Sequence, residues 1–219
     1  ASTCVNLGNL CGRRAQPSPA AAAFEEVIQL FPEASRATLG SPAKSLLETA
    51  YTGRAFARES QGDLDGMVRD CETAITLAST ARARKLRVAF ANVLAADKQP
   101  DRALAMVDPL LKDRNLDGPS AFELSLLYVS SAAAAKQQNG AAHEKERAAL
   151  VDRQIEQAIK LLQRANEGRY FADRSNRKKL HDPPFVPLLT GNAAFQKLLQ
   201  AVEKVPSEVP AAGPAAATR

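Results

Sequence analysis

The first 32 residues alternate large and small side chains in a way that predicts two packed helices. In "CVNLGNLC" and "AAAAFEEVIQLFP" apolar residues recur every three or four positions, which is the period of a helix with one apolar face. Gly8 and Ala20 would let the two helices approach closely, and Pro32 would end the second helix because proline has no amide donor. The residues expected to fill the space beside this contact are Leu7, Cys11 and Phe24.

The same pattern recurs along the chain and predicts further helix pairs. The units cover about 1–34, 43–79, 80–114 and 119–169. In the second unit Gly62 marks a turn between helices at about 43–60 and 64–78, and Cys71 takes the large packing site. The small-residue sites are Ala55 and Met67 in the second unit and Ala91 and Ala103 in the third.

The C-terminal part predicts a cap followed by a tail. Prolines at 183, 184 and 187 break any long helix, and Asn192 is a suitable N-cap for a last helix that runs to about Lys204. Phe195, Leu198, Leu199 and Val202 form one apolar stripe of that helix. We therefore expect a capping segment at 174–204. Residues 205–219 are rich in Pro and Ala, which predicts a disordered tail.

These spacings resemble the tetratricopeptide repeat, a helix-turn-helix of about 34 residues. Its characteristic large and small positions match Cys4, Leu7, Gly8, Cys11, Ala20, Phe24, Val27 and Pro32. The resemblance implies an all-α fold over 1–204: a right-handed α-solenoid of antiparallel helix pairs with a C-terminal capping helix.

The C-terminal pattern is similar to the tetratricopeptide region of planctomycete-type bacterial serine/threonine protein kinases. That family commonly closes with "A-x-x-L-L-x-x-A-x-x-x-G-Y/F", a "D-P-x-x-x-P-L" element and "F-x-x-L-L". The matching residues, with Tyr170 beside Phe171, are Ala158, Leu161, Leu162, Ala165, Phe171, Asp182, Pro183, Pro187, Leu188, Phe195, Leu198 and Leu199. The resemblance implies an interaction module that follows a kinase domain.

Composition and charge narrow the class of protein. Of 219 residues 45% are hydrophobic but only 5% are aromatic, which favours helices packed through small side chains over a β-sandwich. No apolar run approaches the roughly 20 residues of a membrane-spanning helix, and no signal peptide opens the chain. We expect a cytoplasmic protein, and the missing initiator Met suggests a piece of a longer one. A net charge of +5 without interleaved aromatic residues argues against nucleic-acid binding.

The chain offers no arrangement of residues suited to catalysis. The glycine-rich loop, HRD and DFG motifs of kinases are missing, as are GxSxG, Walker and HExxH motifs. Three cysteines without CxxC pairing predict neither a disulfide framework nor a metal site, and His143 and His181 are expected at the surface. We therefore expect no enzyme activity, no cofactor and no metal in this chain.

The tetratricopeptide resemblance implies a concave binding face, formed by the first helix of each unit. The partner-binding residues that it nominates are Asn9, Arg13, Thr52, Phe56, Glu59, Lys85, Val88 and Asn92, with Ser2, Val5 and Thr49 beside them. The arginines of "TARARKLR" at 82, 84 and 87 would favour an acidic partner.

Three hypotheses of function remain open from the sequence. The first is a protein-interaction module that binds a protein or peptide segment on its concave face. The second is a structural module that docks on its own kinase domain or associates with another copy of itself. The third is an enzyme of unknown type.

Overall fold

The structure, a computed structural model, describes residues 2–32, 38–137 and 144–204, and these ranges contain helices and turns but no β-strand. The predicted all-α class is therefore confirmed. The chain divides into two compact units, Ala1–Leu110 and Leu111–Arg219, and each is described by itself. A single repeat domain over 1–204 stays a prediction. His143 and the tail expected at 205–219 lie outside the described residues.

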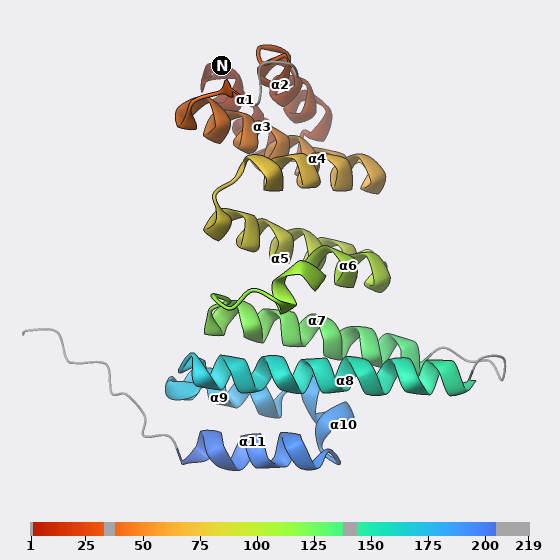
Figure 1. The fold of residues 1–219 in the computed structure, drawn as a ribbon. Coiled ribbons are helices and arrows are strands. Elements are labelled where there is room, and N and C mark those ends of the chain that lie inside the picture. The colour runs from red at the N-terminus through yellow and green to blue at the C-terminus, as the bar shows by residue number, and fades with distance from the viewer. Residues whose placement is uncertain (1, 33–37, 138–143, 205–219) are drawn as a thin grey trace, which may run out of the picture. The chain divides into compact units, whose positions relative to one another are not determined.

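The first unit consists of helices that pack in chain order (Figure 1). Their bounds are α1 (Ser2–Arg13), α2 (Pro17–Gln29), α3 (Ser41–Glu59), α4 (Leu64–Leu77), α5 (Thr80–Ala96) and α6 (Pro100–Leu111). Helix α1 packs on α2 and α3, α2 packs on α3, α3 on α4, and α4 on α5. Arg87 of α5 donates a hydrogen bond to the Met106 carbonyl of α6 at 3.1 Å. We call α1/α2, α3/α4 and α5/α6 the first, second and third layers.

Local signals in the sequence explain where these helices begin. Gly62 has a φ of +78°, a left-handed conformation that glycine adopts without strain, and so forms the expected turn between α3 and α4. The Asp63 carboxylate then caps α4 by accepting a hydrogen bond from the Gly66 amide at 2.8 Å. Pro100 is the first residue of α6, where its missing amide leaves no hydrogen bond unmade.

The ring of Phe24 lies between two glycines and sets how closely α1, α2 and α3 pack. A Cβ atom added to Gly8 would lie 2.7 Å from Phe24 Cζ, and one added to Gly53 would lie 2.2 Å from it. Both distances are far below a carbon–carbon contact, which is about 3.5–4.0 Å. Gly8 of α1 and Gly53 of α3 therefore make room for an aromatic ring from α2, and Phe24 is buried as predicted.

The prediction that Leu7 fills the same contact is wrong. Its side chain is 50% exposed, whereas Val5, Gly8 and Cys11 form the buried stripe of α1. Leu7 lies one residue, or about 100° of helical rotation, away from Gly8 and so points off this stripe.

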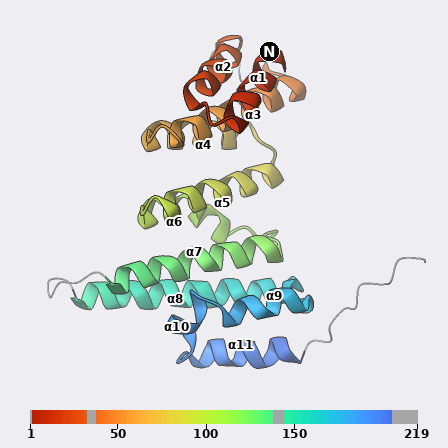
Figure 2. The ribbon, with the colours of Figure 1, turned by 180° about the vertical axis from the view of Figure 1, so that it is seen from behind.

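The second unit is built on a long antiparallel pair, α7 (Gly118–Gln137) and α8 (Glu144–Glu167). Ala158, Leu162 and Ala165 of α8 are buried, as the repeat pattern predicts. The shorter elements that follow are η2 (Tyr170–Ala172), α9 (Arg174–Lys178), η3 (Lys179–His181), α10 (Phe185–Leu189) and α11 (Ala193–Glu203). In Figures 1 and 2 these elements lie on one side of α8.

Aromatic contacts and a capped helix complete the second unit. Phe122 of α7 stacks on Tyr170 with ring centroids 4.9 Å apart and also contacts Phe185 of α10 at 5.7 Å. Helix α11 begins as predicted, because Asn192 accepts hydrogen bonds from the amides of Ala194 and Phe195. Its buried stripe holds Phe195, Leu198 and Val202, and α11 contacts α8.

We predict that Gly8→Ala destabilises the first unit, whereas Gly12→Ala on the same helix does not. The added methyl group at position 8 would overlap the Phe24 ring, an overpacking effect of about 1–3 kcal/mol. At Gly12 no atom lies within 4 Å of the added Cβ, so the higher helix propensity of alanine should stabilise by about 0.5–1 kcal/mol. Chemical denaturation measures both changes, and equal stabilities of the two variants would contradict the account of Phe24.

Candidate functional site

A groove opens where the end of α1, the start of α2 and the second half of α3 meet. Its volume is about 420 Å³, within the range of about 300–1,000 Å³ that is usual for ligand pockets. The residues that line this α1–α3 groove are Gly8, Asn9, Gly12, Arg13, Ala15, Gln16, Pro17, Ala20, Phe24, Gly53, Phe56, Ala57 and Ser60. Three predicted binding residues, Asn9, Arg13 and Phe56, are thus brought together.

The wall and floor of the α1–α3 groove are largely apolar. Phe24 and Ala20 come from the buried face of α2, and Gly8, Gly12 and Gly53 also line the groove without contributing a side chain. Phe56 is 40% exposed and stacks on Phe90 of α5 with ring centroids 5.0 Å apart. Such a stack favours one orientation of the Phe56 ring.

Two polar residues of the α1–α3 groove, Asn9 and Arg13, come from α1. Arg13 is the charged residue among those that line it, and Asn9 lies one helical turn before it. Within the described part of the chain, neither side chain makes a hydrogen bond or an ion pair. A guanidinium and an amide next to an apolar wall can bind a carboxylate and a peptide group.

Two residues of the predicted binding face are buried in the folded chain. Thr52 and Val88, like Val5, are each less than one tenth exposed. When the first helices of the layers are aligned on Gly8, Ala55 and Ala91, these residues take the same position, three residues before the small one. That position lies on the same helix face as the small residue, and therefore faces the neighbouring helix.

The remaining predicted residues lie outside the α1–α3 groove. Lys85 and Asn92 are exposed on α5 but do not line it. Glu59 is half-buried and accepts a hydrogen bond from the Ser60 hydroxyl at 3.3 Å. Of the predicted residues, Asn9, Arg13 and Phe56 therefore line the α1–α3 groove, together with Gln16, Ala57 and Ser60.

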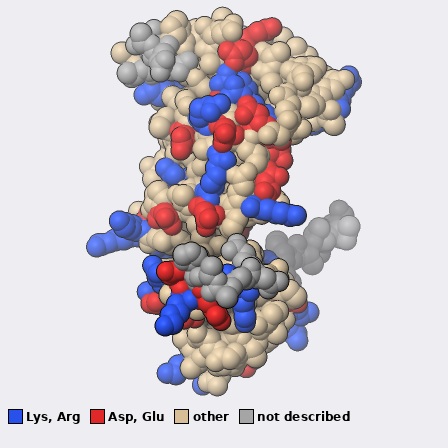
Figure 3. Space-filling model, turned by 90° about the vertical axis from the view of Figure 1, so that its right-hand side faces the viewer, with Lys and Arg blue, Asp and Glu red and all other residues tan. Residues whose placement is uncertain are grey.

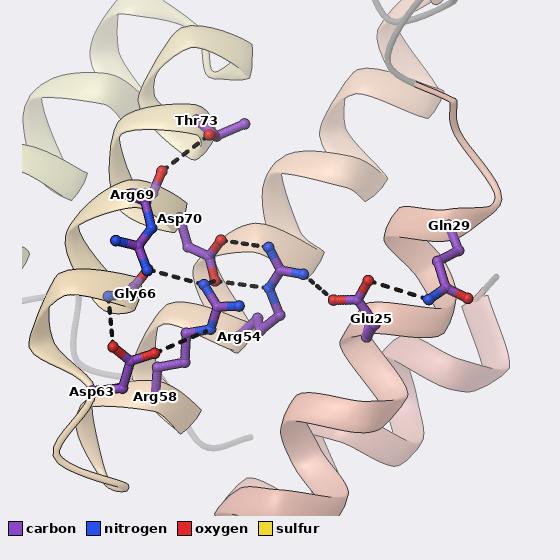
Figure 4. Close-up of polar contacts among 9 residues, drawn as sticks. All are labelled: Glu25, Gln29, Arg54, Arg58, Asp63, Gly66, Arg69, Asp70 and Thr73. Atoms are coloured by element: carbon purple, nitrogen blue, oxygen red, sulfur yellow. Dashed lines mark hydrogen bonds and ion pairs between the residues drawn. The ribbon is translucent and has the colours of Figure 1, made fainter.

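A charged network lies directly beside the α1–α3 groove and joins α2, α3 and α4 (Figure 4). Arg54 of α3 donates to both oxygens of Asp70 of α4, at 2.8 Å from Nε and 2.5 Å from Nη2. It also forms an ion pair with Glu25 of α2. The side chains of Arg54 and Asp70 are only 11% and 3% exposed, so this pair is largely removed from water.

Arg58 extends the network by one turn of α3. Its Nη1 atom lies 3.1 Å from an Asp70 oxygen and 3.2 Å from the Gly66 carbonyl. Burial alone would lower the pKa of Arg54, but the hydrogen bonds and negative charges of Asp70 and Glu25 outweigh it and raise that pKa above its ordinary value. The guanidinium therefore stays charged, and it clamps α2 and α4 to α3 next to Phe24 and Gly53.

The motifs and spacings of the sequence did not predict this network of Glu25, Arg54 and Asp70. One feature of the sequence does point to a buried ion pair. When the first helices of the layers are aligned, Arg54 takes the position that is apolar in the other two layers, where it is Leu7 and Phe90. A charge at an otherwise apolar contact position predicts a buried partner of opposite sign.

Comparison of the chain with protein-family models, with curated proteins and with solved structures found no match to any of them. The function must therefore be inferred from the geometry of this chain.

The residue types that most often hold metals, His, Cys, Asp and Glu, do not line the α1–α3 groove in the part of the chain that the structure describes. Among the described residues, no group of three or more His, Cys, Asp or Glu side chains could hold a metal ion. His181 is exposed, as predicted. Burial raises the pKa of the Cys71 thiol to about 12, with Arg87 opposing the shift only in part. Cys71 thus belongs to the core, in agreement with its predicted packing role.

The second unit also has a hollowed surface, along α8. Two cavities of about 580 and 370 Å³ share Asp152, Ile155 and Leu188 as lining residues. Their rim carries both signs of charge, and Lys160 pairs with Glu156 of the same helix at 2.7 Å. No predicted binding residue lies there, so the α1–α3 groove is the stronger candidate.

We predict that Asp70→Asn destabilises the first unit by about 3 kcal/mol, because it removes a charge that Arg54 needs in a buried site. Glu72→Gln is the matched control, since Glu72 is exposed on the same helix and surface changes usually stay within about 0.5 kcal/mol. Urea denaturation measures both. If Asp70→Asn is as stable as the control, the network contributes nothing to holding the helices together.

We also predict that Cys71 resists alkylation in the folded chain. A buried thiol whose pKa is about 12 is almost entirely protonated at pH 8, and the thiolate is the reactive form. Iodoacetamide followed by mass spectrometry should label the half-buried Cys4 first and should label Cys71 only in denaturant. Equal labelling of Cys71 in folded and denatured protein would show that it is accessible and would reopen a nucleophilic role.

Proposed function

We propose that this chain is a non-catalytic protein-interaction module that binds a segment of a partner protein in the α1–α3 groove. The observation that carries the proposal is the combination of an ordered aromatic wall with an unpaired Arg13 and Asn9 in one groove. Its architecture is a tetratricopeptide-like α-solenoid. Support comes from the chain-order packing of α1–α5 and from the matching burial of Val5, Thr52 and Val88.

The groove's chemistry suggests what kind of segment it binds. Phe56, Phe24 and Ala57 offer an apolar wall to one large side chain, and Arg13 offers a positive charge beside it. Asn9 and Gln16 have amides that both donate and accept, as a peptide backbone requires. The ligand is therefore a segment with a large apolar residue next to Asp or Glu.

The surface charge supports a protein partner over nucleic acid. On the face that Figure 3 draws, Lys and Arg are interspersed with Asp and Glu. Nucleic-acid-binding surfaces instead gather positive charge into a patch or stripe.

None of the described helices is long and apolar enough to cross a membrane. We further propose a cytoplasmic setting and a parent serine/threonine kinase, for which the closing motif around Asp182 and Phe195 is the support.

The test is selection from a random peptide library with the whole chain as bait. Peptides with a large apolar residue next to Asp or Glu should be enriched, with Kd values near 1 µM, about −8 kcal/mol. Phe56→Ala should weaken them by about 2 kcal/mol, as the loss of an aromatic anchor does. Arg13→Glu should weaken them too, and wild-type binding should fall with added salt.

Lys85→Glu is the matched control, because Lys85 is exposed in the same unit but does not line the α1–α3 groove. It should leave binding nearly unchanged. If Lys85→Glu weakens the selected peptides as much as Arg13→Glu does, general charge attraction explains binding. If Phe56→Ala binds as tightly as wild type, the groove is not the binding surface.

A further inference from the structure

The first layer exposes three large apolar side chains. Leu7 and Leu10 of α1 are 50% and 38% exposed, and Leu30 at the end of α2 is 59% exposed. None of the three lines the groove. In Figures 1 and 2 α1 and α2 lie on one side of α3, and no described helix of the first unit lies beyond them. We call the side of α1 and α2 that faces away from α3 the outer face of the first layer.

The second and third layers show what contacts the repeat position that Leu7 takes in the first layer. Aligned on Gly8, Ala55 and Ala91, Leu7 is equivalent to Arg54 in the second layer and to Phe90 in the third. Arg54 is held by Glu25 of the layer before it, and Phe90 is fully buried and stacks on Phe56 of the layer before it. Leu7 thus occupies a contact position between layers, and the element that suits it is another helical layer.

The charges of the outer face suit an identical copy of itself. Helix α1 carries no charged residue before Arg13, so two copies would bring no like charges together at their centre. Arg14 lies at the turn between α1 and α2, whereas Glu26 lies towards the other end of α2, where Cys4 Sγ donates to its carboxylate at 3.4 Å. In a symmetric dimer whose two-fold axis runs across α1 and α2, the Arg14 end of one copy lies against the Glu26 end of the other. Arg14 of each copy is therefore brought towards Glu26 of its partner copy.

In a head-to-tail assembly the outer face of one copy would pack on α11 of the next copy, and the exposed residues of α11 give this arrangement less support. The residues that α11 exposes are small, polar or charged, among them Ala194, Lys197 and Ala201. A head-to-tail assembly would need a large apolar surface there to receive Leu7 and Leu30. We propose that the chain forms a symmetric dimer through the outer face of the first layer, with Leu7, Leu10 and Leu30 at its centre.

Sedimentation equilibrium of the whole chain tests the proposal. Wild type should show a monomer–dimer equilibrium with a Kd on the order of 10 µM, and Leu7→Glu should raise it at least about 30-fold. Leu150→Glu is the control, because Leu150 is a leucine of the second unit with 39% exposure. It should leave the equilibrium unchanged, and circular dichroism should show that both variants remain folded.

Charge reversal tests the two-fold arrangement. Arg14→Glu and Glu26→Arg should each weaken the dimer by about tenfold at low salt, and the double variant should recover most of that loss. A wild-type chain that stays monomeric at about 200 µM, twenty times the expected Kd, would overturn the proposal. It would also be overturned if Leu150→Glu dissociated the dimer as strongly as Leu7→Glu, or if the double charge reversal gave no recovery.

Discussion

The contact of the Phe24 ring with Gly8 and Gly53 is the constraint on which the first unit depends. It fixes the separation of three helices, because a single methyl group on either glycine would overlap the ring. The same three residues line the α1–α3 groove, so the contact that stabilises the fold also shapes the candidate site. A substitution that spreads α1 from α3 is therefore expected to change the width of the groove as well as the free energy of unfolding.

The charged network supports this contact from the neighbouring residues. Glu25 follows Phe24 in α2 and Arg54 follows Gly53 in α3, so the ion pair joins the same two helices at the same level. Burying such charges is unfavourable unless each finds several partners, and Asp70 has two: it accepts hydrogen bonds from Arg54 and forms an ion pair with Arg58. Because the pair requires one relative position of α2, α3 and α4, it also disfavours other registers of these helices.

Sequence reasoning predicted the elements well and the surfaces only in part. Helix periodicity, Gly62 and Asn192 are local signals, and they correctly placed the turn between α3 and α4 and the start of α11. Whether Leu7 or Val5 faces inward depends on which neighbouring helix is present, and a pattern of apolar residues does not specify that. Thr52 and Val88 were expected at the surface for the same reason. The pairing of Arg54 with Asp70 and Glu25 joins residues far apart in the sequence and became visible only in the folded chain.

The central claim is that a partner segment binds between α1 and α3. The most direct measurement is a backbone amide NMR titration of the chain with a peptide that it binds. The account predicts that the largest shift changes fall on Gly8–Gln16 and Gly53–Ser60, with little change along α8 and α11. Largest changes around Asp152, Ile155 and Leu188 would place the binding surface on the second unit and contradict the account.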